Sequence, residues 1–188
     1  MKSLFIFDFD DTLLESSAEV RVTHEDGTTS SMSSEEYAKY TEMPGDLFDF
    51  ADFDAYPQNA EIIEPVFAEL RAAIALSGPQ NVIILTARSN PLPVELFLKN
   101  SNVPTIGVVA VGSANPMAKA SFVLSKVKDD SYDEVVLFED NVKNIRTIRK
   151  VLRDGKVRLT TNRVSNGRIV DVQTESILKT LLLKNWKF

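Results

Sequence analysis

The sequence has no cysteine and a single histidine, His24, among its 188 residues. The absence of cysteine excludes disulfides, thiolate metal sites and cysteine nucleophiles. His24 lies beside a predicted hairpin turn, so a catalytic triad built on histidine finds no support. The apolar run at the start, residues 4–7, is too short for a signal peptide, and no apolar run is long enough to span a membrane. A soluble, cytoplasmic protein is therefore expected.

Charge is unevenly distributed along the chain, although the net charge is only −6. Residues 1–70 carry 17 acidic side chains against three basic ones, whereas residues 141–170 carry nine basic side chains against Asp154 alone. Such an asymmetry can indicate a nucleic-acid contact on one side of a protein. The length and the 44% hydrophobic content fit one globular domain over residues 1–188.

An apolar run near the start, residues 4–7, leads directly into Asp8, Asp10, Asp11 and Thr12. The run is typical of a buried strand in a parallel sheet, and such sheets bind ligands at the carboxyl ends of their strands. Two carboxylates at that position repel each other unless a cation or a proton compensates, and carboxylates suit Mg²⁺. A carboxylate can also act as a nucleophile. The alternative is that these are acidic turn residues without further function.

Residues 15–58 predict a flap or small cap inserted after the first strand. Asp26-Gly27 is a favoured hairpin turn between residues 18 and 31, and Ser33 with Glu36 forms a capping box for a short helix to about residue 40. The aromatic side chains that follow are expected to pack this insertion onto the core, and the alternative is that they stack on a substrate: Phe48, Phe50, Phe53 and Tyr56.

The rest of the chain alternates between helical and strand patterns, which predicts an α/β fold with a parallel sheet and helices on both faces. Asn59 is expected to cap the first helix, and Asn115-Pro116 is expected to start a later one. We expect helices over 59–77 and 91–99, a third that starts at 115, a fourth that follows 141 and ends near 153, and a final one over 174–185. We expect strands over 81–85, 106–111 and 134–138, and a hairpin over 157–170.

Polar residues follow three of the predicted strands, and parallel pairing would bring them to one edge of the sheet. Together they supply what phosphoryl transfer needs: a nucleophile, metal ligands, and groups that hold the phosphoryl oxygens. We expect Asp8 to be the nucleophile and Asp10 the general acid and base. Asp140 would complete the metal site with Asp8. Thr86 and Lys119 would bind the phosphate, with Lys119 favoured over Lys126 and Lys128 because those two lie later in the same helix.

The order of four segments, DFDDTL, ILTAR, a mid-chain lysine and FEDNVKN, resembles the haloacid dehalogenase-like (HAD) superfamily over residues 4–144. The resemblance implies a Rossmann-like fold, dependence on Mg²⁺, and phosphatase chemistry through a phosphoaspartate. It assigns the nucleophile to Asp8 and the acid and base to Asp10, whose main-chain carbonyl also binds the metal. It assigns phosphate binding to Thr86 and Lys119, and a metal ligand to Asp140.

Two positions depart from the HAD pattern. Asn144 stands where a second aspartate is frequent, and Glu139 replaces a frequent glycine, so Glu139 is interpreted as an indirect or water-mediated metal ligand with Asn144 behind it. Arg88 is either a surface residue at a loop start or a contact to the substrate phosphate or leaving group. Thr12 is expected to order the loop after Asp10 through a local hydrogen bond.

A basic helix face indicates one type of partner. Lys143, Arg146, Lys150 and Arg153 share a face that can follow a nucleic-acid backbone, or that is simply solvated. The compact pattern is similar to the phosphatase modules of polynucleotide end-repair enzymes, but no Walker-type loop is present. The expected function is a Mg²⁺-dependent phosphatase acting on a nucleotide, a nucleic-acid end or a small phosphate ester. The alternative is a phosphate- or nucleic-acid-binding module with little turnover.

Overall fold

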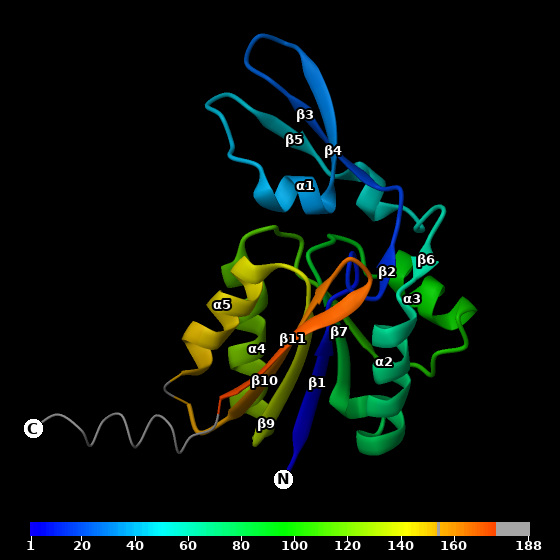
Figure 1. Cartoon of the computed structure of the whole chain (residues 1–188), viewed down its shortest axis with the longest axis vertical. Coiled ribbons are helices and arrows are strands. Elements are labelled where there is room, and N and C mark those ends of the chain that lie inside the picture. The colour runs from blue at the N-terminus through cyan, green and yellow to red at the C-terminus, as the bar shows by residue number, and fades with distance from the viewer. Residues whose placement is uncertain (154, 176–188) are drawn as a thin grey trace, which may run out of the picture.

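A six-stranded sheet runs through the protein in the order β11-β10-β9-β1-β7-β8 (Figure 1). The computed structural model describes residues 1–153 and 155–175. All neighbouring pairs are parallel except β10 and β11, so the predicted α/β fold with a parallel sheet is confirmed and only its edge strand runs antiparallel. The strands are β1 (Ser3–Phe7), β7 (Val82–Thr86), β8 (Gly107–Ala110), β9 (Glu134–Glu139), β10 (Arg158–Ser165) and β11 (Arg168–Glu175).

Helices cover both faces of the sheet, as predicted. Helices α2 (Glu64–Ser77) and α3 (Leu92–Asn100) pack on one face, and α4 (Pro116–Asp130) and α5 (Val142–Leu152) pack on the other. Successive residues of β1 point to opposite faces, and both sets are buried because each face has its own apolar cluster. In one cluster the rings of Phe7 and Phe138 stack at 4.4 Å between centroids.

The start of α2 differs from its prediction. Helical spacing of the apolar residues predicted a helix capped by Asn59, but α2 begins at Glu64 and Asn59 has a positive φ of 48°. The intervening β6 (Glu61–Ile62) instead pairs with β2 (Leu14–Glu15). The strand pairing overrides the local helical pattern because it satisfies backbone groups that an isolated first turn leaves free.

The C-terminal part confirms the hairpin and leaves the last helix outside the described residues. Strands β10 and β11 turn at Asn166 and Gly167, whose φ values of 50° and 67° explain why this residue pair is favoured there. The predicted helix over 174–185 begins within β11, and its remaining residues lie outside the described part. Among the described residues, no helix combines the length and apolar character that crossing a bilayer requires.

Residues 16–60 form a separate antiparallel unit that lies over the carboxyl ends of the central strands (Figure 1). It has a three-stranded sheet in the order β4-β3-β5 and two short helices. The predicted hairpin and the capping box of Ser33 with Glu36 are both confirmed. Its elements are β3 (Glu19–Thr23), β4 (Thr29–Ser33), α1 (Ser34–Lys39), β5 (Leu47–Asp49) and the 3₁₀ helix η1 (Ala51–Asp54).

Candidate functional site

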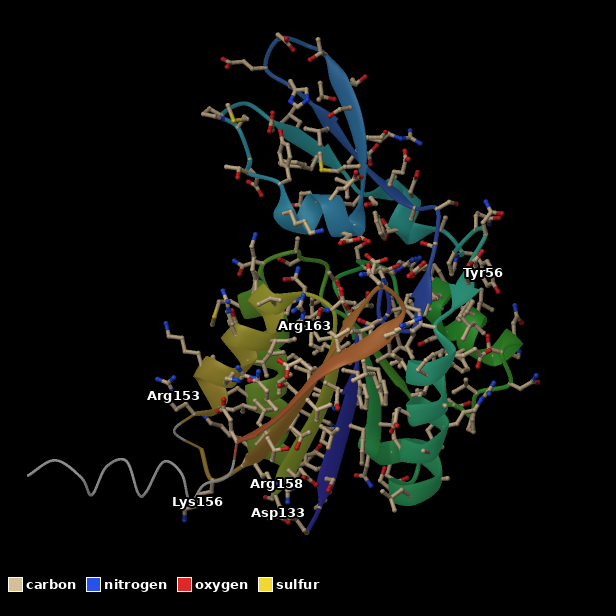
Figure 2. The ribbon with its side chains drawn as sticks, viewed as in Figure 1. Tyr56, Asp133, Arg153, Lys156, Arg158 and Arg163 are labelled. Carbon is tan, nitrogen blue, oxygen red and sulfur yellow. The ribbon has the colours of Figure 1, made fainter. Side chains whose placement is uncertain are left out.

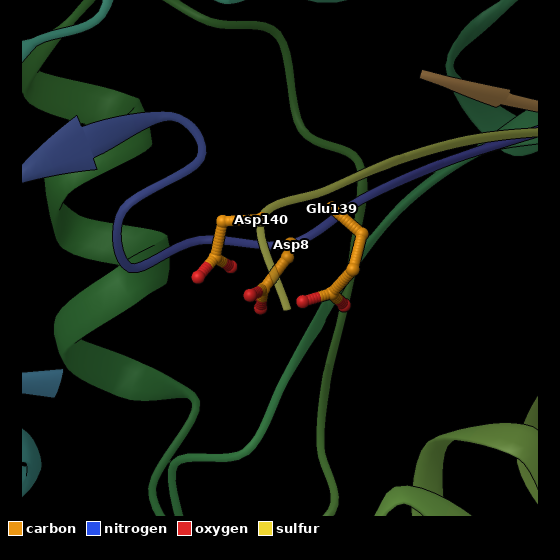
Figure 3. A group of neighbouring side chains, drawn as sticks. All are labelled: Asp8, Glu139 and Asp140. Carbon is orange, nitrogen blue, oxygen red and sulfur yellow. The ribbon is translucent and has the colours of Figure 1, made fainter. Parts of the chain in front are cut away.

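Three carboxylates meet at the carboxyl ends of β1 and β9 (Figure 3). Because Phe7 pairs in register with Phe138, the side chains that follow these two strands emerge next to each other. One oxygen from each of Asp8, Glu139 and Asp140 lies within 4.8 Å of the others, a spacing that can hold a metal ion. Asp8 and Glu139 are buried and Asp140 is half-buried.

Lys119 brings a positive charge into this cluster. Its Nζ lies 2.7 Å from Asp8 Oδ1 and 3.0 Å from Glu139 Oε2. The position follows from the sequence, because Asn115 accepts a hydrogen bond from the backbone N–H of Met117 and so fixes the start of α4. Burial opposes the charge of Lys119, but Asp8 and Glu139 raise its pKa above the usual value. The competing Lys126 instead pairs with Asp130 at 2.6 Å near the end of α4.

One ammonium does not balance three carboxylates in a buried site. Burial, and then the charge of Glu139, raise the pKa of Asp8 above its usual range despite the opposing effect of Lys119. Burial, and then the charges of Glu139 and Asp8, raise the pKa of Asp140 in the same direction. A group of carboxylates that repel one another stabilises an added cation, and an all-oxygen set of ligands suits Mg²⁺ or Ca²⁺. The residues present therefore fit a divalent metal.

Two side chains behind the cluster, those of Asn144 and Thr12, hold its members by hydrogen bonds. Asn144 Nδ2 donates to Glu139 Oε1 at 3.1 Å, and the backbone N–H of Asn141 donates to the same oxygen at 3.1 Å. Thr12 is fully buried, and its hydroxyl donates to Asp140 Oδ1 at 3.3 Å. Thr12 therefore contacts a candidate metal ligand directly, in place of the local loop bond that was expected.

Thr86 completes the floor of the site from the neighbouring strand. It ends β7, which pairs in parallel with β1, and its side chain is buried. Its hydroxyl accepts a hydrogen bond from the backbone N–H of Arg88 at 3.2 Å and lines the same cavity as Asp8 and Lys119. Parallel pairing thus brings Thr86 to the edge that carries Asp8, and Lys119 reaches the same cavity from α4.

Arg88 is buried, with 4% of its surface exposed, so of its two interpretations the surface residue is wrong. Its Nε and Nη2 donate to the two carboxylate oxygens of Asp10 at 2.9 and 2.7 Å. Its Nη1 donates to the carbonyls of Phe53 and Ala55 at 2.6 and 3.1 Å. The guanidinium also lies over the rings of Phe9 and Phe53. These contacts hold Asp10 in place and use four of the five N–H bonds of the Arg88 guanidinium. The contact of Arg88 with a substrate phosphate stays a prediction.

A cavity of about 630 Å³ separates the floor of the site from the antiparallel unit. The Ser34 hydroxyl, at the start of α1, donates to Asp11, and burial is the main cause that raises the pKa of Asp11 to about 6. Ser89 donates to Asp54 Oδ1 at 2.5 Å. These contacts fasten the unit to the loops that carry the site.

No sequence pattern identified the side chains that the antiparallel unit contributes to the cavity. Tyr37, Tyr40, Phe50 and Phe53 all line it. The capping box located α1, but nothing in it shows which face of that helix meets the site. Packing onto the core was the favoured prediction for Phe50 and Phe53, which line the cavity. Tyr56 does pack against Phe97, at 6.2 Å between centroids.

The four basic residues of the predicted helix face are all exposed on or just beyond α5. Lys143 lies at the start of the helix and lines the cavity. Arg153 lies at the end remote from the antiparallel unit (Figure 2). Arg146 and Lys150 lie between them, so the face runs away from the site along α5. Its contact with nucleic acid stays a prediction.

Comparisons of the chain with protein-family models, curated proteins and solved structures gave no match. The HAD resemblance of the four segments therefore stays an expectation. The residues themselves place a carboxylate, an ammonium and a hydroxyl around one cavity: Asp8, Lys119 and Thr86. A second carboxylate, Asp10, lines the same cavity and is held by Arg88.

Proposed function

We propose that the protein is a Mg²⁺-dependent phosphatase of the HAD type, which hydrolyses a phosphomonoester through an aspartyl-phosphate on Asp8. One observation carries this proposal: the buried Asp8 carboxylate lies 2.7 Å from the Lys119 ammonium and within 4.8 Å of oxygens from Glu139 and Asp140, on the wall of a cavity. A nucleophilic carboxylate that meets a phosphate dianion needs a neighbouring cation and ligands that can hold a metal ion.

The reaction proceeds in two displacements at phosphorus. An Asp8 oxygen forms a bond to phosphorus while the bond to the ester oxygen breaks, and Asp10 gives a proton to the departing alkoxide. The alcohol leaves, and Asp10 then takes a proton from a water molecule as that water attacks phosphorus. The bond between phosphorus and Asp8 breaks, which releases inorganic phosphate and restores the Asp8 carboxylate and the protonated form of Asp10.

The other residues stabilise the charge that develops on the phosphoryl oxygens. Lys119 offers an ammonium beside Asp8, and Thr86 offers a hydroxyl from the neighbouring strand. Asp8, Asp140 and Glu139, with the Asp10 carbonyl that the resemblance implies, would hold Mg²⁺. When bound, Mg²⁺ supplies positive charge that offsets the repulsion between phosphate and carboxylate.

The antiparallel unit would act as the flap of this enzyme. It lies over the carboxyl ends of the strands, and its contacts with Arg88, Asp11 and Ser89 connect it to the loops of the site. A cover of this kind keeps bulk water from the aspartyl-phosphate until the alcohol has left. The short β2 and β6 pair at its base is where it joins the main domain.

Phosphate release by the wild type and by Asp8→Asn tests the proposal. With Mg²⁺, the wild type should release phosphate from aryl and alkyl phosphates, mononucleotides or phosphorylated oligonucleotides, and the variant should release none while keeping a wild-type circular dichroism spectrum. Acid quenching should trap labelled phosphate on the wild type alone. Turnover by Asp8→Asn at the wild-type rate would contradict the assigned nucleophile. Phosphate binding without turnover of any ester would favour the alternative, a binding module.

A further inference from the structure

The charge on the walls of the cavity limits what can enter it with the phosphate. Seven carboxylate residues line the cavity against three basic ones. Lys119 is engaged by Asp8 and Glu139, and Arg88 is engaged by Asp10. A divalent metal and the dianionic phosphate of the proposed substrate would cancel each other. The space beyond the phosphate therefore keeps an excess of negative charge, to which Asp11, Glu42 and Asp54 contribute.

Aromatic rings line the part of the cavity that the antiparallel unit contributes. Phe50 remains 39% exposed although its ring packs against that of Phe48. Its centroid lies 5.3 Å from that of Tyr37, with the two ring planes at 78°. Two rings that meet nearly at right angles form a corner, and their π faces attract a cation.

Glu42 adds a carboxylate to the lining that these rings share. Burial, and then the charge of Glu42, raise the pKa of Tyr37 above its usual value. Glu42 is also one of the charges that raise the pKa of Tyr40, after the hydrogen bond to Asp46 and burial. Glu42, Tyr37 and Tyr40 all line the cavity. Aromatic faces beside a carboxylate are a combination that recognises organic ammonium groups.

We propose that the leaving group of the substrate carries a cationic amine on an apolar body and no second anionic group, with the amine held by Glu42, Tyr37 and Phe50. That this substrate carries a phosphate ester rests on the proposed function. A polynucleotide end is disfavoured, because its next phosphate would meet the acidic walls. The exposed Lys143 is the competing feature of the lining, since it is placed to favour an anionic leaving group.

A matched series of ligands tests the charge preference. Benzyl phosphates with a trimethylammonio, a tert-butyl or a carboxylate group at the para position differ mainly in charge, since the first two groups have the same shape. The corresponding benzylphosphonates cannot be hydrolysed, so their dissociation constants, measured by calorimetry with Mg²⁺ at low salt, report binding without turnover. We expect the cationic ligand to bind about tenfold more tightly than the neutral one, and the carboxylate to bind most weakly.

Variants assign the preference to the residues. Glu42→Gln and Phe50→Leu should each reduce the cation-to-neutral affinity ratio to within about threefold of one. Glu25→Gln removes a carboxylate from the hairpin of the same unit, outside the cavity lining, and should leave both the ratio and the basal activity unchanged.

The two proposals fail separately in this experiment. Equal binding of the cationic and neutral phosphonates, or tightest binding of the carboxylate, overturns the substrate class. So does a ratio that survives in Glu42→Gln and Phe50→Leu. Discrimination in binding, with no Asp8-dependent hydrolysis of any benzyl phosphate, overturns the phosphatase and leaves the cation preference standing. A phosphorylated oligonucleotide that is hydrolysed faster than every benzyl ester overturns the substrate class while supporting the phosphatase.

Discussion

Replacing Arg88 with glutamine should damage both the fold and the proton transfer that we assign to Asp10. Arg88 makes four hydrogen bonds, two to Asp10 and two to carbonyls of the antiparallel unit. Breaking a buried ion pair costs about 3–5 kcal/mol, and the partial exposure of Asp10, 16% of its side chain, lowers this to about 2–3 kcal/mol. For a protein of this size, that corresponds to a fall in Tm of roughly 5–10 °C.

The effect on catalysis should depend on the leaving group. As Asp10 gives up its proton it becomes a carboxylate, and the Arg88 guanidinium stabilises that charge while holding both oxygens in place. General acid catalysis contributes about 10²–10⁴-fold, so Arg88→Gln should lower kcat by about 100-fold on a benzyl phosphate. A 4-nitrophenyl phosphate needs little protonation of its leaving oxygen and should lose much less.

Two further variants separate this positioning effect from a general loss of structure. Arg71→Gln is the control: Arg71 is exposed on α2 and its guanidinium also lies over an aromatic ring, that of Phe67. This variant should leave kcat unchanged and should change Tm by no more than a few degrees. The double variant of Arg88→Gln with Asp10→Asn should be no slower than Asp10→Asn alone, because Arg88 acts through Asp10. Equal losses on the benzyl and nitrophenyl esters, or additive losses in the double variant, would refute the reasoning.

Two other changes test neighbouring parts of the site. Lys119→Met leaves Asp8, Glu139 and Asp140 without their ammonium, so kcat should fall at least about 100-fold, and the rise in Tm that Mg²⁺ produces should be larger than in the wild type. Thermal unfolding with and without Mg²⁺ measures this, and an unchanged Mg²⁺ effect contradicts it. Reversing the charges of Arg146 and Lys150 to glutamate should leave hydrolysis of benzyl phosphate unchanged, and an equal loss on small esters and on oligonucleotides would count against a nucleic-acid track on α5.

The floor of the site was predictable because its signals are local and its assembly follows a general rule. Asp8, Thr86 and Glu139 each end or follow an apolar strand, and parallel pairing brings such ends to one edge. Lys119 was placed by the cap at Asn115, which fixes the first turn of α4. No long-range information was needed beyond the order of strands and helices.

The roof of the site, which is the antiparallel unit of residues 16–60, was not predictable, because its placement depends on tertiary contacts. The burial of Arg88 follows from carbonyls of Phe53 and Ala55, backbone groups whose direction is set by η1 and carries no sequence signal. The start of α2 was not predictable for the same reason. Helical spacing of the apolar residues predicted a start at Asn59, but residues 61–62 form β6, which pairs with β2. Local preference decides such segments only when no partner strand competes for their backbone groups.

The contacts between roof and floor converge on the loop after β1. Arg88 joins the carbonyls of Phe53 and Ala55 to Asp10, and Ser34 donates to Asp11, one residue further along the chain. Asp8, by contrast, is held by Lys119 and by the backbone of β9, neither of which belongs to the antiparallel unit. A displacement of the unit would therefore disturb Asp10, the proposed acid and base, before Asp8, the proposed nucleophile. In the proposed reaction, proton transfer then depends on the position of the antiparallel unit more than attack on phosphorus does.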